Sequence, residues 1–183
     1  MEWYGRLRDL IRGHGPISMA VSGGAWGLGC NAVHFMDVLA WWSGERPLDI
    51  DTEALDPEWL PAKRKGFLEV FGSMSVVYTE GSRLTLTADY DAAPIEIKVD
   101  VGGLVWSISD SEKMARRSDG LELPGRVDLQ SEMSAGLVDL ILATSTCSLP
   151  TLADSVEIHR LLLRGLRVHL IRSGGSWNHV PIT

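Results

Sequence analysis

The sequence is short of cysteine, of basic residues and of long apolar runs. Its 183 residues include two cysteines, Cys30 and Cys147, which form neither a disulfide framework nor a zinc motif. The five histidines match neither of the common metal-binding spacings, HxxxH and HExxH. We therefore expect no metal site and no disulfide.

The charge and the apolar runs exclude two classes of partner. The formal net charge is −7, and the longest basic cluster is Lys63–Lys65, which argues against binding along nucleic acid. No stretch approaches the ~20 apolar residues that span a bilayer, and the N-terminus lacks the apolar run of a signal peptide. We expect a cytoplasmic protein with no nucleic-acid partner and no membrane partner.

The rest of the composition, 45% hydrophobic and 22% charged residues, suits a globular chain with one sizeable core. Breakers and apolar periodicity divide the chain into segments, and no linker marks a second domain. The expected elements are a helix over 2–12, a strand over 17–22, a helix ending near 43–44, a possible strand over 48–55 within a surface excursion over 45–65, strands within 67–109, a charged connection over 112–126, and helices over 129–144 and 151–171. The last helix is expected to pack through Val156, His159, Leu163, Leu166 and Leu170.

The segment over 67–109 has the period of two that is typical of half-buried strands. The turn at Gly102-Gly103 joins two such runs so that their large apolar groups share one face. The pairs it predicts are Val101 with Leu104, Val99 with Trp106 and Ile97 with Ile108. A second hairpin over 72–78 and 83–88 completes an antiparallel meander of at least four strands. The expected fold class is α+β: a single domain over 1–183 with a mostly antiparallel open sheet and helices on one face.

The most informative stretch is a glycine-rich turn, residues 23–29, that leads straight into a helix. At about 100° per residue, polar side chains gather on one side of this helix, within an arc of about 120°. That side carries Asn31, His34, Asp37, Val38 and Trp41, whereas Phe35, Met36, Leu39 and Trp42 form the expected core side. Structural alternatives stay open, with Asn31 as an N-cap, His34 as a core histidine and Asp37 as its partner.

A strand, a glycine-rich turn and a helix also suggest a dinucleotide-binding fold, with Asp49 or Asp51 near the position of a ribose-binding acid. The glycines are spaced GxxGxG instead of GxGxxG, and no repeated βαβ units follow. A nucleotide fold is therefore not expected. The free amides at the start of the helix could still hold an anion or a polar substrate group.

The run over 4–44 resembles the start of the C-terminal domain of the glucose-fructose oxidoreductase and inositol dehydrogenase family (Gfo/Idh/MocA). The resemblance rests on Trp-Gly-Leu-Gly-Cys-Asn-Ala-Val-His-Phe-Met-Asp at 26–37, on Trp-Trp-Ser-Gly at 41–44 and on Val-Pro-Ile-Thr at 180–183. The family joins a Rossmann domain that binds NAD or NADP to a C-terminal α+β domain like that of dihydrodipicolinate reductase. The resemblance covers essentially the whole chain, and none of the chain looks like the Rossmann half.

The resemblance implies that His34 is an active-site histidine, followed by Asp37 on the same helix. The family often has an aspartate four residues before this histidine, whereas the present sequence has Cys30 there and Asn31 beside it. The implied activity is hydride transfer at the carbinol carbon of a sugar-like substrate, in which a group with a pKa near neutrality removes the hydroxyl proton. NAD or NADP would be bound by a Rossmann domain or subunit, and not by this chain alone.

Four further residues are candidate substrate contacts. Asn31 is expected to orient a sugar hydroxyl. Trp26 offers an apolar face to a sugar ring but is equally consistent with plain packing. Arg64 could bind a carboxylate or phosphate, or belong to a solvated basic patch. His159 could reach the site from the last helix, although its apolar neighbours favour a buried structural role.

These observations favour two functions of different classes. The first is the substrate-binding and oligomerisation half of an NAD(P)-dependent sugar or polyol oxidoreductase. The second is a stand-alone binding or scaffold module of the same fold, which Cys30 at the position of the acid favours. In both, the open face of the sheet, made only partly polar by Val77 and Val105, predicts a homo-oligomer through the sheet.

Overall fold

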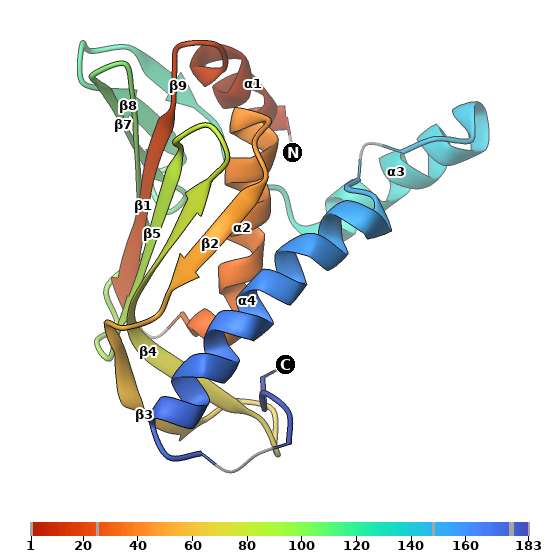
Figure 1. The fold of residues 1–183 in the computed structure, drawn as a ribbon. Helices are drawn as coiled ribbons and strands as arrows, with labels where there is room; N and C mark the ends of the chain where they lie inside the picture. The colour runs from red at the N-terminus through yellow and green to blue at the C-terminus, as the bar shows by residue number, and fades with distance from the viewer. Residues whose placement is uncertain (1, 25, 148, 176–177, 183) are drawn as a thin grey trace.

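The structure is a computed structural model that describes residues 2–24, 26–147, 149–175 and 178–182. Helices cover one face of a large sheet, and one helix projects away from the body (Figure 1). The elements are α1 (Glu2–Ile11), β1 (Ile17–Gly24), α2 (Leu28–Ser43), β2 (Pro47–Asp51), β3 (Leu55–Pro61), β4 (Leu68–Tyr78), β5 (Arg83–Asp89), β6 (Glu96–Val101), β7 (Leu104–Ser109), β8 (Met114–Arg117), β9 (Glu122–Pro124), α3 (Gln130–Thr144) and α4 (Leu152–Arg172). The α+β class expected from the sequence is confirmed.

Within the described residues, nine strands form one sheet in the order β2-β4-β5-β1-β6-β7-β8-β9, and β3 pairs with β4. The described strand pairs are antiparallel apart from β1 and β5, which run parallel. The open, mostly antiparallel sheet is therefore confirmed. The continuous meander is wrong, because β1 lies between β5 and β6. Strand order depends on which edges meet after the chain has folded, and the local apolar pattern carries no information about it.

The hairpin of β6 and β7 has the register that the turn predicts. Gly102 and Gly103 both have positive φ, at 60° and 83°, as a two-residue turn of type I′ requires. The observed pairs are Val101 with Leu104, Val99 with Trp106 and Ile97 with Ile108. The hairpin of β4 and β5 is confirmed as well. Turn length and face burial fix register locally, so these predictions needed no tertiary information.

Two regions contain more strands than the sequence predicts, which is one possible strand over 48–55, where β2 lies, and none over 112–126. The surface excursion over 45–65 holds β2 and β3, which pair with opposite ends of the long strand β4 and whose registers both shift. The charged connection over 112–126 holds β8 and β9, in which Ala115 and Leu123 are the buried residues. One buried residue in a short strand leaves no apolar alternation to detect.

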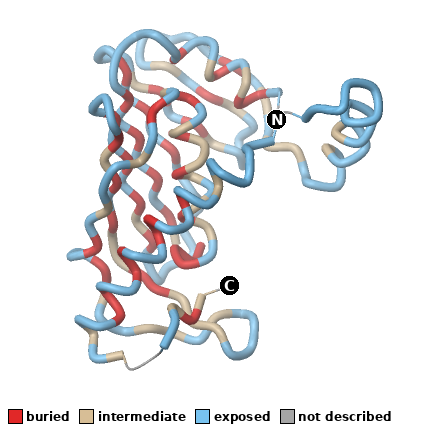
Figure 2. The backbone as a smooth tube through the Cα atoms, turned by 45° about the vertical axis from the view of Figure 1, so that its right-hand side comes forward, coloured by how far each residue is buried: buried red, intermediate tan, exposed pale blue. Residues whose placement is uncertain are grey.

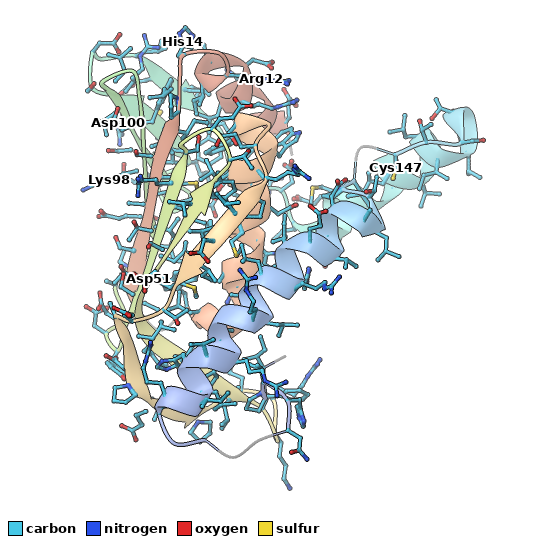
Figure 3. All side chains as sticks on the ribbon, in the orientation of Figure 1. Arg12, His14, Asp51, Lys98, Asp100 and Cys147 are labelled. Carbon is cyan, nitrogen blue, oxygen red and sulfur yellow. The ribbon has the colours of Figure 1, made fainter. Side chains whose placement is uncertain are left out.

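The two faces of the sheet differ sharply in burial (Figure 2). In β1 the residues that face the helices, Ile17, Met19 and Val21, are buried, whereas Ser18 and Ala20 on the outer face are exposed. Lys98 and Asp100 of β6 extend from the outer face, away from the helices (Figure 3). The core therefore lies between the sheet and the helices, as expected.

Helix α4 packs through a different face from the one expected. The predicted contacts Val156, His159 and Leu163 are exposed, although Leu166 and Leu170 are buried as predicted. The observed packing face consists of Ile158, Leu161, Leu162, Gly165, Leu166, His169 and Leu170. Gly165 sets this face, because a Cβ there would lie 2.7 Å from the Cγ2 of Ile50 in β2. Because an apolar pattern does not count glycine, this close contact of α4 with β2 leaves no signal in the sequence.

Helix α3 is the exception among the helices. It is rich in apolar residues, yet of its described residues 130–144 none is buried, and it projects away from the covered face of the sheet (Figures 1 and 2). The helices on that face are α1, α2 and α4. In the part of the chain that the structure describes, no helix is long and apolar enough to cross a membrane.

Candidate active site

Helix α2 carries the predicted catalytic histidine, and its start is held from outside the helix. The helix begins after Gly27, which has a φ of 69° and offers no side chain as a cap. Instead, Glu69 of β4 accepts a hydrogen bond from the backbone N–H of Gly29, at 3.0 Å. Partial burial raises the pKa of Glu69, and the hydrogen bonds from the start of the helix act against that rise. The carboxylate occupies the place where an external anion would bind.

Asn31 therefore does not cap the helix through its side-chain oxygen. It lies inside the first turn, where its side-chain amide donates to the carbonyl oxygens of Gly27, at 3.0 Å, and of Trp26. The N-cap role considered for Asn31 is therefore wrong. The helix already begins at Leu28, three residues earlier, and Glu69 accepts a hydrogen bond from its first turn.

A cavity of about 260 Å³ lies between α2 and the first half of α4. It is lined by Val33, His34 and Asp37 of α2, by Ser155, Ile158 and His159 of α4, and by Pro150 in the connection before α4. Three of the predicted site residues, His34, Asp37 and His159, thus meet in one place. His159 is exposed at this cavity, and the buried structural role weighed for it does not apply.

Asp37 is the electrostatic centre of this cavity. Its partial burial raises the pKa of the carboxyl, while the positive charge available on His34 and on His159 lowers it, and Asp154 raises it further. The same carboxylate also affects a core residue: burial raises the pKa of Tyr78, and the negative charge of Asp37 raises it further. The Tyr78 hydroxyl donates to the carbonyl oxygen of Met36, at 2.9 Å, and so fixes the helix one residue before Asp37.

His159 has a defined tautomer. Its Nδ1 lies 2.7 Å from the carbonyl oxygen of Ser155, one helical turn earlier. Because a carbonyl oxygen can only accept, Nδ1 carries a proton, and in the neutral ring Nε2 is the nitrogen able to accept one. The cavity therefore contains two imidazoles beside one carboxylate, which together can accept, hold and return a proton.

The other predicted contacts do not line this cavity. Trp26 is buried; its indole N–H donates to the carbonyl oxygen of Thr87, at 2.9 Å, and its ring meets Phe35 edge to face. The structure thus gives Trp26 the packing role. Arg64 lies exposed between β3 and β4 with its guanidinium 5.9 Å from the ring centre of Phe67, which corresponds to the solvated alternative.

Three residues near the site were missed from the sequence. Ser155 and Pro150 line the cavity, and Glu69 anchors the helix that carries His34. Only Glu69 had a signal, because an acid inside the apolar run over 67–71 needs a partner when it is partly buried. Across the described residues, no group of three His, Cys, Asp or Glu side chains is arranged to hold a metal ion.

The comparisons with known proteins bear on the fold. No protein-family model and no curated protein matches the sequence. Solved structures do match it, among them an aldose-aldose oxidoreductase from Caulobacter crescentus complexed with glycerol, with a TM-score of 0.63, 15% identity and coverage of 94% of this chain and 58% of that one. The chain shares their fold.

Two further matches are similar in kind. An oxidoreductase domain protein from Kribbella flavida has a TM-score of 0.63 and 11% identity over 98% of this chain and 63% of that one. The UDP-N-acetylglucosamine 3-dehydrogenase GnnA from Acidithiobacillus ferrooxidans has a TM-score of 0.56 and 13% identity over 91% of this chain and 56% of that one. The chain therefore spans 56% to 63% of the length of these three oxidoreductases.

Proposed function

We propose that this chain is the C-terminal, substrate-binding half of an NAD(P)-dependent oxidoreductase that acts on a sugar or polyol. The observation that carries the proposal is the cavity between α2 and α4, where His34, Asp37 and His159 meet in a fold shared with oxidoreductases. The resemblance of residues 26–37 to the Gfo/Idh/MocA family, with its histidine at His34, supports the same conclusion.

In this proposal His34 takes the proton of the substrate hydroxyl, because an imidazole changes charge near neutral pH. Asp37 beside it stabilises the imidazolium that forms. The Nε2 of His159 accepts a hydrogen bond from a second hydroxyl and orients the ring. A nicotinamide, held outside this chain, supplies the hydride chemistry at the carbinol carbon.

The residues at the start of α2 do not fit the pyrophosphate of a dinucleotide. Glu69 already occupies the amides there, and a Cβ at Gly27 would lie 2.8 Å from its carboxyl carbon. A second anion in that place would meet the carboxylate at short range. We therefore assign the cofactor to a separate domain or subunit and derive no step in this chain that uses it.

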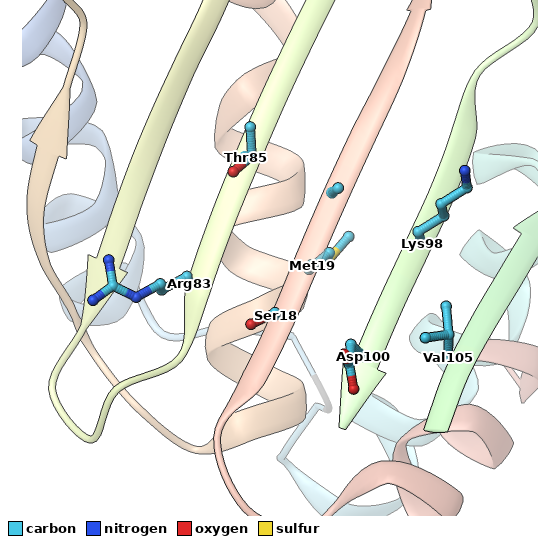
Figure 4. Close-up of a pocket in the computed structure, with 8 residues that line it drawn as sticks. Ser18, Met19, Arg83, Thr85, Lys98, Asp100 and Val105 are labelled. Atoms are coloured by element: carbon cyan, nitrogen blue, oxygen red, sulfur yellow. The ribbon is translucent and has the colours of Figure 1, made fainter. Parts of the chain in front are cut away.

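We further infer a homo-oligomer through the outer face of the sheet. Along β1 the small residues Ser18 and Ala20 form a depression of about 310 Å³, bordered by Arg83 of β5 and by Lys98 of β6 (Figure 4). Small residues between long charged ones let a second sheet approach closely. Both cysteines are free and exposed, which supports a cytoplasmic location within the same proposal.

The second candidate function is a stand-alone binding or scaffold module of the same fold. The observation that favours it is Cys30, which lies exposed on α2 four residues before His34, where the related enzymes often have an acid. Such a module would bind a sugar-like ligand in the cavity without changing it.

The deciding experiment uses this chain together with its cofactor domain, and follows NADH or NADPH absorbance over a panel of aldoses and polyols. We expect turnover with at least one substrate, and His34→Ala should lower kcat by roughly 10²-fold or more. The control His14→Ala alters an exposed histidine between α1 and β1 and should keep full activity. Ligand binding without turnover in the unaltered protein would support the scaffold module instead, and an unchanged rate in His34→Ala would remove the catalytic role.

A further inference from the structure

The wall of the cavity between α2 and α4 carries negative charge that no Lys or Arg balances. The described residues that line it include the carboxylate of Asp37 and the imidazoles of His34 and His159, but no Lys and no Arg. Asp154, in the first turn of α4, adds a second carboxylate, whose charge raises the pKa of Asp37. Carboxylates are ionised at neutral pH, whereas imidazoles gain and lose their charge there. The constant part of the charge at the cavity is therefore negative.

The Asp37 carboxylate also has no hydrogen-bond donor of its own. Within the described residues, no backbone or side-chain group donates a hydrogen bond to it, and the ion pairs with Arg join other acids. The side chain is nevertheless partly buried, which makes a strong acceptor without a donor costly. A ligand that donates to Asp37 removes this cost, and a positively charged donor removes most of it.

The starts of the two helices that form the cavity are closed to an external anion. At the start of α2, Glu69 accepts the hydrogen bond from the backbone N–H of Gly29. At the start of α4, the backbone N–H of Asp154 donates to the Thr151 hydroxyl oxygen, at 3.2 Å, and the Asp154 carboxylate accepts from the backbone N–H of Thr151, at 3.1 Å. A helix start attracts anions when its N–H groups are open, but here each one holds a carboxylate of this chain. An anionic ligand thus finds no cation on the described wall and no open helix start.

We propose that the cavity takes an amino sugar or an amino polyol, with the ammonium group beside Asp37, and that it disfavours sugar acids and sugar phosphates. The inference rests on the proposed function, because it names the class of sugar or polyol that the same cavity binds. The carbon chain lies against the apolar part of the wall, Val33 and Ile158. The hydroxyl that loses its proton to His34 is on a different carbon from the amine. Asp154 supplies a second negative charge, so that Asp37 is not the only counter-ion for the ammonium group and the imidazolium.

The test compares three polyols of the same carbon skeleton that differ at one end only: sorbitol has a hydroxyl there, glucamine an ammonium group and gluconate a carboxylate. Calorimetry with this chain at pH 7.5 gives the dissociation constants, and kcat/KM in the complex with the cofactor domain gives the same ratios if binding by the chain alone is weak. We expect glucamine to be preferred over sorbitol by roughly tenfold or more, and gluconate to be the weakest of the three. Salt at about 1 M should reduce the preference, because it screens the charges.

Two variants locate the preference within the molecule. Asp37→Asn keeps the size of the side chain and removes its charge, so glucamine and sorbitol should then bind within about twofold of each other. Asp37 accepts no hydrogen bond from the described residues, and the substitution should therefore preserve the fold, which urea denaturation checks. The matched control Asp9→Asn removes a charge from an exposed position of α1 that does not line the cavity, and should leave the preference unchanged.

The outcomes separate this inference from the proposed function. Equal binding of glucamine and sorbitol, or tighter binding of gluconate, would overturn the inference. A preference that persists in Asp37→Asn would overturn it as well, because the ammonium group would then lie elsewhere. Selective binding of glucamine in a complex that oxidises none of the sugars and polyols would retain the inference and remove the oxidoreductase. Turnover of uncharged polyols without any preference for the amine would do the opposite.

Discussion

Helices α2 and α3 are nearly equal in length, at 16 and 15 residues, and both are rich in apolar side chains. Helix α2 buries six residues against the sheet, whereas the described residues of α3 bury none. Two features separate them. The buried residues of α2 recur on one side, above the strands of the sheet, whereas the apolar residues of α3 point in several directions and the helix projects away from the sheet.

The ends of the two helices differ as well. Glu69 holds the first turn of α2, the Tyr78 hydroxyl binds its carbonyl at Met36, and Gly44 ends it in the left-handed conformation with φ at 78°. The contacts with Glu69 and Tyr78 come from β4, another part of the same chain. Among the described residues, no strand gives α3 comparable support; its C-cap Ser145 is left-handed as well, with φ at 56°, but its apolar residues stay exposed. Apolar content by itself thus does not decide whether a helix is covered.

The largest expected effect concerns the packed helix, α2. It compares the loss of stability on replacing two neighbouring tryptophans of this helix. Trp42 is 0% exposed and Trp41 is 40% exposed. Trp42→Ala should reduce the free energy of unfolding by about 3–5 kcal/mol, because it leaves a large cavity in the core. Trp41→Ala removes a partly exposed ring and its contact with the Arg8 guanidinium, 4.8 Å from the ring centre, and should cost about 1 kcal/mol. Urea denaturation measures both, and equal losses would contradict the burial of α2.

An intermediate effect is expected at α4, where it tests whether water reaches the buried ring of His169. Burial and the neighbouring Arg172 lower the pKa of His169, whose ring lies 5.5 Å from that of Trp59. The unfolded chain binds a proton at His169 more readily than the folded chain does. The contribution of neutral His169 to the free energy of unfolding is therefore complete above about pH 6.5 and is lost as the pH falls below that value. Asp37 and Glu69, whose pKa values are raised by burial, act in the opposite sense.

The measurement is therefore a difference between variants. Unfolding by urea from pH 7.5 down to pH 5 should show a steeper loss of stability in the unaltered chain than in His169→Phe, which cannot take up the proton. His159→Phe is the matched control, since this histidine is exposed on the same helix. Parallel pH profiles for the unaltered chain and His169→Phe would mean that water reaches the ring.

The smallest effect belongs to α3. Leu142 is 79% exposed, and Leu142→Ser should change the free energy of unfolding of the isolated chain by less than about 0.5 kcal/mol. The same substitution should lower the binding of an apolar dye such as ANS, because it removes part of an exposed apolar surface. A loss above about 2 kcal/mol would show that α3 folds back onto the body in solution, which would erase its contrast with α2.

Much of the architecture could be predicted where short-range chemistry decides it. The turn at Gly102-Gly103 fixed the register of its hairpin, and the spacing of Met36, Leu39 and Trp42 identified the core side of α2. The same periodicity placed His34 and Asp37 together outside the core. His159 was expected to be buried, although it was also considered within reach of the site. Its exposure beside Asp37 depended on the rotation of α4, which Gly165 sets through its contact with Ile50.

The fold class, most of the helices, two hairpins and the grouping of His34 with Asp37 follow from local sequence patterns, because turns and helical periodicity act over a few residues. Three features depend on the folded chain: β1 enters the sheet between β5 and β6, Glu69 holds the start of α2, and His159 lines a cavity together with His34. These contacts join residues distant in the chain. Their formation depends on how surfaces fit, which no local pattern encodes.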